Sequence, residues 1–349
     1  MIEELKKGIR ILALTLFLAL LLAGVRANAA SCSTQAQMNA QQRDGLSGEA
    51  RTMAAIVQSG DAAGLRAKTL PAVAADFDGI ASSMAALKPL VQTAKITIDN
   101  LYLLDASKDA PGAERTQFFC GSPIVVMTFN GLPQGIYALA ILHATGVPRP
   151  QQISLILASA QGNQWQLAGF YAKPMTEADH DGLWYWVSAR KYAQEKENWP
   201  AWIYYRVAED LLNPVAFLSS PNLQRLQQET EQAHPGDFPD KSPVALHAEG
   251  ANFSLSAIHT TTEFGALDLD VHYAPDPTQA AQLTQPIEAR KQVTLVMSAL
   301  LAQHPGLREA FHGMWVHADQ GDSSLFALEL PMDQISPGTP QVLTRPSDR

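Results

Sequence analysis

Asp268, Asp270 and His272 recur at every second position late in the chain, with the apolar residues Leu269 and Val271 between them. Side chains alternate between the two faces of a strand, so the three polar groups share one face if the segment is extended. With His259 and His317 on neighbouring strands, carboxylates and imidazoles could then bind a divalent metal ion. The same alternation also fits an ordinary antiparallel sheet whose acids face water. We favour this second interpretation and expect neither a metal site nor a cofactor.

Tyr102 and His143 are the best candidates for a polar pocket in the N-terminal half, because each lies in an expected strand. Neither has a catalytic partner at a fixed spacing. The chain contains no Gly-x-Ser-x-Gly elbow, His-Glu-x-x-His motif, phosphate-binding glycine loop or Cys-x-x-Cys motif. We therefore assign no catalytic residue.

The two cysteines, Cys32 and Cys120, are 88 positions apart. An even number of cysteines in an exported chain predicts a disulfide, worth about 3–4 kcal/mol for a loop of this length. The alternative is a lipidated Cys32, with Ala29-Ala30-Ser31 as its recognition sequence. We favour the disulfide because such sequences usually carry leucine three residues before the cysteine.

The first 29 residues have the features of a secretory signal peptide. Lys6, Lys7 and Arg10 precede an apolar run from Ile11 to Val25, and Ala27-Asn28-Ala29 provides a cleavage site. The run is shorter than the about 20 residues of a membrane-spanning helix, although an uncleaved anchor is the alternative. We expect a periplasmic or secreted protein that touches a membrane only through an uncleaved signal or a lipidated Cys32.

The charge of the chain argues against nucleic-acid and anionic-lipid partners. The formal net charge is −9, and it becomes −11 once the four basic and two acidic residues of segment 1–29 are removed. An acidic surface repels both kinds of polyanion. We expect no nucleic-acid partner.

These candidate groups must be positioned by an α+β fold. Residues 33–91 have helical spacing, with breaks at Gly60 and near Pro71, and the apolar period changes to two from Lys95. Strands are predicted at 96–104, 116–120, 124–129, 136–143, 153–158 and 165–171. Residues 33–175 are predicted to form one α+β domain, and by element order about residues 45–175 of it resemble the nuclear transport factor 2-like (cystatin-like) fold, whose helices close a curved sheet. The resemblance implies a cone that encloses a small-molecule site in many members and only binds or dimerises in many others.

Residues 176–233 are predicted to be helical and are rich in aromatic side chains. Six positions resemble a single tetratricopeptide repeat, in which small residues let two helices approach and aromatic residues fill the groove: Tyr185, Ala189, Tyr192, Ala201, Tyr205 and Ala208. An ordinary helical hairpin of similar composition is the alternative. Its tryptophans form our candidate interaction surface: Trp184, Trp186, Trp199 and Trp202.

The remaining chain is predicted to contain a linker at 234–243, a ββαββ unit at 244–335 and a disordered tail at 336–349. We expect an exported, non-catalytic protein that uses the aromatic hairpin to bind a protein partner or itself. The alternative is a small-molecule-binding protein, or a hydrolase- or isomerase-like enzyme, with a pocket at Tyr102 and His143. A third interpretation buries the aromatic residues between the flanking units, where they only hold the molecule together.

Overall fold

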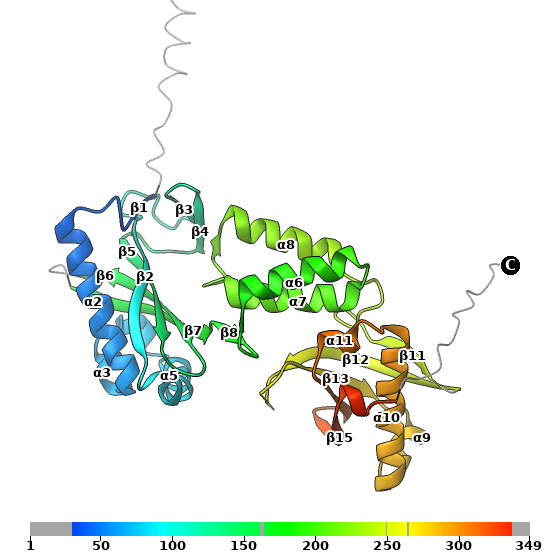
Figure 1. Cartoon of the computed structure of the whole chain (residues 1–349). Helices are drawn as coiled ribbons and strands as arrows, with labels where there is room; N and C mark the ends of the chain where they lie inside the picture. The colour runs from blue at the N-terminus through cyan, green and yellow to red at the C-terminus, as the bar shows by residue number, and fades with distance from the viewer. Residues whose placement is uncertain (1–29, 161–163, 249, 264, 337–349) are drawn as a thin grey trace, which may run out of the picture.

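A computed structural model describes residues 30–160, 164–248, 250–263 and 265–336 (Figure 1). The protein has an α+β fold with two five-stranded sheets, separated along the chain by a helical segment. The predicted signal peptide and nearly all of the predicted tail lie outside the described residues. Within the described ranges, no helix combines the length and apolar character that crossing a bilayer requires.

The N-terminal unit begins with β1 (Ser31–Thr34) and continues with a group of helices: α2 (Ala40–Ser59), α3 (Ala62–Ala67), α4 (Pro71–Ala74) and α5 (Asp78–Val91). Asn39 and Gln42 form a capping box that starts α2. Gly60 ends that helix with a φ of 73°, a left-handed conformation that glycine adopts without steric cost. The predicted helix break at Gly60 is therefore confirmed.

The larger N-terminal sheet has the strand order β1-β2-β5-β6-β7, and all of its neighbouring strands are antiparallel. Its longer strands are β2 (Lys95–Asp105), β5 (Ile136–Thr145), β6 (Gln151–Ser159) and β7 (Trp165–Pro174). A smaller sheet contains β3 (Arg115–Cys120), β4 (Val125–Asn130) and β10 (Leu218–Ser219). Every strand predicted in this region is present.

Both faces of the larger N-terminal sheet are covered. Ala140 and Leu142 of β5 belong to a core shared with α2 and α5, whereas Leu139 and Ile141 face a second core that contains Phe118 of β3. Strands β5 and β6 are consequently buried along most of their length. This double cover explains their nearly continuous apolar sequences.

The helical segment contains α6 (Gly182–Gln194), α7 (Asn198–Leu212) and α8 (Pro221–Ala233), preceded by the short pair β8 (Thr176–Glu177) and β9 (His180–Asp181). The small residues Ala189, Ala201 and Ala208 are fully buried where this segment packs. One apolar core continues from these helices into the C-terminal sheet. The segment expected to be a linker contributes to this core, because Phe238 is buried with its ring 4.8 Å from that of Trp199.

The C-terminal sheet has the order β11-β12-β13-β14-β15, and only the β13–β14 pair is parallel. Its strands are β11 (Val244–Ala248), β12 (Ala251–Thr261), β13 (Asp268–Ala274), β14 (Gly313–Gln320) and β15 (Ser323–Pro331). Between β13 and β14 lie α9 (Pro277–Gln282), α10 (Pro286–Gln303) and α11 (Leu307–Ala310), and a 3-10 turn, Met332–Gln334, follows β15. The predicted ββαββ unit therefore gains β11, and its single predicted helix is divided at Thr284-Gln285.

Candidate metal centre on the C-terminal sheet

One face of the C-terminal sheet is apolar and is covered by α10. Leu269, Val271 and Val316 are fully buried in the same core as Val293 and Met297 of α10. Since side chains alternate along a strand, Asp270, His272 and His317 lie on the opposite face. The parallel register places His272 directly beside His317.

Three side chains on this open face converge within ligand distance of one another. His272 Nε2 and His317 Nε2 each lie 3.2 Å from Asp270 Oδ1, and one donor atom from each residue fits within 4.8 Å of the other two. The two imidazole rings stack with centroids 4.7 Å apart. Asp270 Oδ1 is buried and has no hydrogen-bond partner among the described residues. Two imidazole nitrogens therefore converge on a buried carboxylate oxygen that has no hydrogen-bond partner among the described residues.

Asp319 supports the cluster from the end of β14. Its Oδ2 atom lies 2.6 Å from His272 Nδ1, which can donate a proton to it. This hydrogen bond turns His272 Nε2 towards Asp270 and fixes the tautomer that a metal ligand needs. Asp319 was not among the residues singled out from the sequence, although its position two residues after His317 mirrors the Asp270-x-His272 spacing.

The electrostatics of the cluster favour a positive charge. Asp270 and then Asp319 raise the pKa of His272 to about 9, against the opposing effect of burial. Burial lowers the pKa of the neighbouring His317, which holds that imidazole neutral. Burial also tends to raise the pKa of Asp270, but its interactions with His272 and His317 outweigh this effect and hold that pKa below its ordinary value. In the protein without metal, one imidazolium thus lies between two carboxylates.

The expectation that the acids of β13 simply face water is wrong. Asp268 is 0% exposed, with Oδ1 lying 3.1 Å from His312 Nδ1, and Asp270 and His272 are each about three-quarters buried. The cause is tertiary: β12 and β14 flank β13 on both sides, so long side chains from three strands crowd the same face. The sequence showed the alternation but not this crowding.

Tyr102 and His143 do not form the pocket expected of them. Both lie on the face of the N-terminal sheet away from α2. Tyr102 of β2 is opposite Leu139 of β5, and His143 lies further along β5, opposite Thr97. Four residues along β5 separate the two positions by about 13 Å. Tyr102 is buried in the core, and His143 is 3.9 Å from Asp99. A cavity of about 860 Å³ in this unit is lined by other residues, among them Asn39, Glu49, Lys68 and Trp165.

Two of the four tryptophans proposed as an interaction surface are buried. Trp186 donates through Nε1 to Glu229 Oε2 at 2.7 Å, and Trp199 donates to Asp237 Oδ1 at 2.9 Å while stacking on His304. These two rings are therefore buried and hold neighbouring parts of the molecule together, as the third interpretation of the sequence proposed. The outward prediction is wrong for them because α8 and the C-terminal unit cover those faces of the hairpin.

The other two tryptophans are more accessible. Trp202 is partly buried against Phe238 and His234, with ring centroids at 4.4 and 5.2 Å. Trp184 is 39% exposed and stacks on His180 at 3.6 Å. The apolar surface of α6 also includes Leu183 and Val187, 58% and 57% exposed, which sequence reasoning missed.

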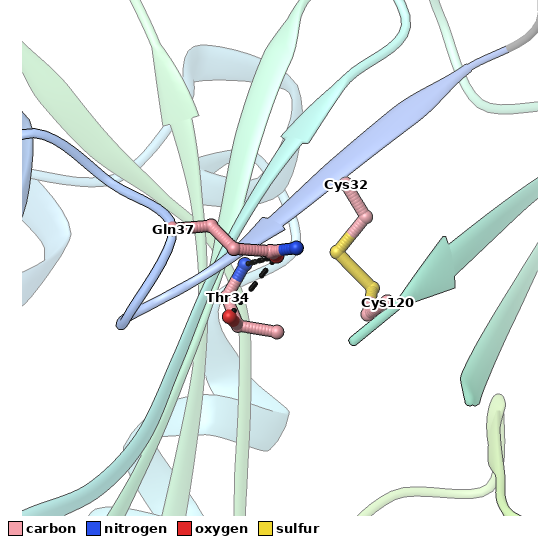
Figure 2. The surroundings of a disulfide bond; sticks show 4 residues. All are labelled: Cys32, Thr34, Gln37 and Cys120. Atoms are coloured by element: carbon pink, nitrogen blue, oxygen red, sulfur yellow. Dashed lines mark hydrogen bonds between the residues drawn. A yellow bond between two sulfur atoms is a disulfide. The ribbon is translucent and has the colours of Figure 1, made fainter. Parts of the chain in front are cut away.

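The predicted disulfide joins β1 to β3 (Figure 2). Cys32 and Cys120 have Cα atoms 5.1 Å apart, and the pair links the first strand of the larger sheet to the smaller sheet. Beside it, the backbone N–H of Thr34 donates to Gln37 Oε1 at 2.9 Å. The bond uses the sulfur that a lipid on Cys32 would need.

Comparisons with protein-family models, curated proteins and solved structures found no match for this chain.

Proposed function

We propose that the protein is exported and binds a divalent transition-metal ion through Asp270, His272 and His317. The convergence of their three donor atoms within 4.8 Å supports this proposal most directly. The donor set contains two imidazoles and one carboxylate, which suits zinc and its first-row neighbours better than magnesium or calcium. Binding would replace a proton on His272 Nε2 with the metal ion beside Asp270, while Nδ1–H keeps its hydrogen bond to Asp319.

The export part of this proposal has its own support in the N-terminal region of the chain. The Cys32–Cys120 disulfide favours an oxidising compartment, and the N-terminal sequence is typical of a signal peptide. We expect mass spectrometry of the protein from its native host to show a chain that begins at Ala30 or Ser31. A retained Met1 together with the apolar run would contradict export.

Metal binding is tested by titrating Zn²⁺ into the purified, metal-stripped chain by calorimetry. We expect one ion per chain, and we expect His317→Ala and Asp270→Asn to abolish binding. His143→Ala, on the other sheet, serves as the matched histidine control and should bind like the unaltered protein. Equal zinc binding by His317→Ala, or none by the unaltered protein, would contradict the proposal.

A second candidate function remains for the helical hairpin, now restricted to the exposed side of α6. Leu183, Trp184 and Val187 present adjacent apolar side chains there, an arrangement that favours a protein contact. We propose that this surface pairs with a second copy of the chain. Sedimentation equilibrium should show a dimer that Val187→Asp converts to a monomer, with Gln228→Asp at an exposed position of α8 as control. A monomer at every concentration of the unaltered protein would refute self-association.

A further inference from the structure

We infer that His259 is a fourth ligand of this metal centre and that the bound ion is four-coordinate, as zinc is in closed sites. This inference rests on the proposed function. It adds a residue, a coordination number and an ion class to that function.

The sheet register places His259 on the correct face. Strand β12 runs antiparallel to β13, and His259 lies directly opposite Asp270. Residues opposite each other in an antiparallel pair point to the same side of the sheet, with Cβ atoms about 5 Å apart. Three neighbouring strands thus supply the set, with His259 from β12, Asp270 and His272 from β13, and His317 from β14.

The ring positions are close to those that one ion requires. With Zn–N bonds of about 2.0–2.1 Å and tetrahedral angles, the centroids of two imidazoles on the same zinc lie about 5 Å apart. The centroids of His272 and His317 are 4.7 Å apart, but their planes are only 13° apart, so at least one ring must also rotate before both in-plane lone pairs point at one ion. His259 and His272 are at 6.0 Å with their planes 66° apart. An approach of roughly 1 Å by the His259 ring would give this pair the centroid spacing of two imidazoles on one zinc ion.

His259 has the freedom to make that movement. Its side chain is exposed and makes no hydrogen bond within the described part of the chain. It borders a cavity of about 410 Å³ between β12 and α7, whose opposite wall includes Trp202 and Arg206. Rotation of the imidazole towards Asp270 therefore breaks no hydrogen bond of His259.

Closure by His259 changes what the centre can do. Three protein ligands leave a position for water, as in catalytic zinc sites, whereas four protein ligands fill the tetrahedron and are typical of sites that hold the ion. With three imidazoles and one carboxylate, the centre would join β12, β13 and β14 and would not activate water. This outcome agrees with a non-catalytic binding protein.

Cobalt substitution of the full chain tests the coordination number. Tetrahedral Co²⁺ absorbs visible light much more strongly than five- or six-coordinate Co²⁺. We expect the unaltered protein to give the strong spectrum and His259→Ala the weak one. Zinc affinity should fall by about a hundredfold or more, since even an outer-sphere partner costs about 10–100-fold.

Two further variants make the result specific. His247→Ala removes a histidine from β11 of the same sheet and should change neither spectrum nor affinity. Added imidazole should restore the strong spectrum to His259→Gly, which an effect on folding alone would not produce. If His259→Ala keeps both the spectrum and the affinity of the unaltered protein, the fourth ligand is refuted and the three-ligand site stands. If the unaltered protein binds neither cobalt nor zinc, the proposed function and this inference both fail.

Discussion

The two five-stranded sheets of this protein differ in how many of their faces are covered. The N-terminal sheet has helices on one face and the β3–β4 sheet on the other, so β5 and β6 are buried on both sides. Among the described residues, α10 packs on one face of the C-terminal sheet, and the central strands β13 and β14 alternate between buried and half-buried residues. His317 on β14 converges with two other ligand groups, whereas His143 on β5 lies near one carboxylate, that of Asp99.

The comparison shows how a missing cover creates a place for chemistry. A sheet face buried under apolar side chains cannot accommodate a carboxylate and two imidazoles without a large desolvation cost. An uncovered face can, and neighbouring strands then bring polar groups within a few ångströms of each other. The two units also differ in their cross-link, since the N-terminal one contains a disulfide and the C-terminal one would use a metal ion.

The largest expected effect comes from equivalent truncations in the two sheets. Leu139→Ala removes a fully buried side chain from β5 and should cost about 3–5 kcal/mol. In the metal-free protein, His317→Ala on the open face should cost less than about 1 kcal/mol. Hydrogen exchange of each sheet measures both, because it separates the stabilities of the two units. Similar losses of stability would mean that both side chains contribute equally to their sheets, and the proposed difference between the two sheets would be wrong.

Removal of the disulfide should affect only the N-terminal unit. Cys32→Ser combined with Cys120→Ser opens a loop of 88 residues, and we expect a loss of about 3–4 kcal/mol. Thermal melts of the oxidised protein, the reduced protein and the double variant provide the measurement. A drop in protection of β13 and β14 would show that the units are not independent.

Zinc should stabilise the C-terminal sheet and leave the N-terminal unit unchanged, the opposite of the effect expected for the disulfide. At a free concentration one hundred times its dissociation constant, a ligand of the native state adds about 2.7 kcal/mol to the stability of the unit that binds it. Exchange in β12–β14 should therefore slow with zinc and recover with a chelator, while β5 and β6 stay unchanged. Equal protection of both sheets would indicate non-specific binding.

The smallest expected effect concerns the outer partner of His272. Asp319→Asn keeps the shape of the side chain but weakens its hold on the imidazole, so zinc affinity should fall by about 10–100-fold. Asp322→Asn, an exposed acid in the turn after β14, is the matched control and should have no effect. An unchanged affinity for Asp319→Asn would remove it from the centre.

Much of the fold could be predicted because its signals are local. The change of apolar period near Lys95, the helix break at Gly60 and the alternation in β12 to β15 each depend on a few adjacent residues. The aromatic hairpin was also found, but not which of its faces is covered. Trp186 and Trp199 were expected outside because helical periodicity does not say which neighbour a helix packs against.

The sequence by itself determined the α+β class, the positions of most strands, the cysteine pair and the shared face of Asp268, Asp270 and His272. Only the tertiary structure decided that α10 covers one side of the C-terminal sheet and that polar residues on the other side are half-buried against each other. It also decided the parallel pairing that sets His272 beside His317 across a connection of about forty residues. The physical reason is that side-chain direction follows from the local backbone, whereas the approach of two strands depends on every element that packs between them.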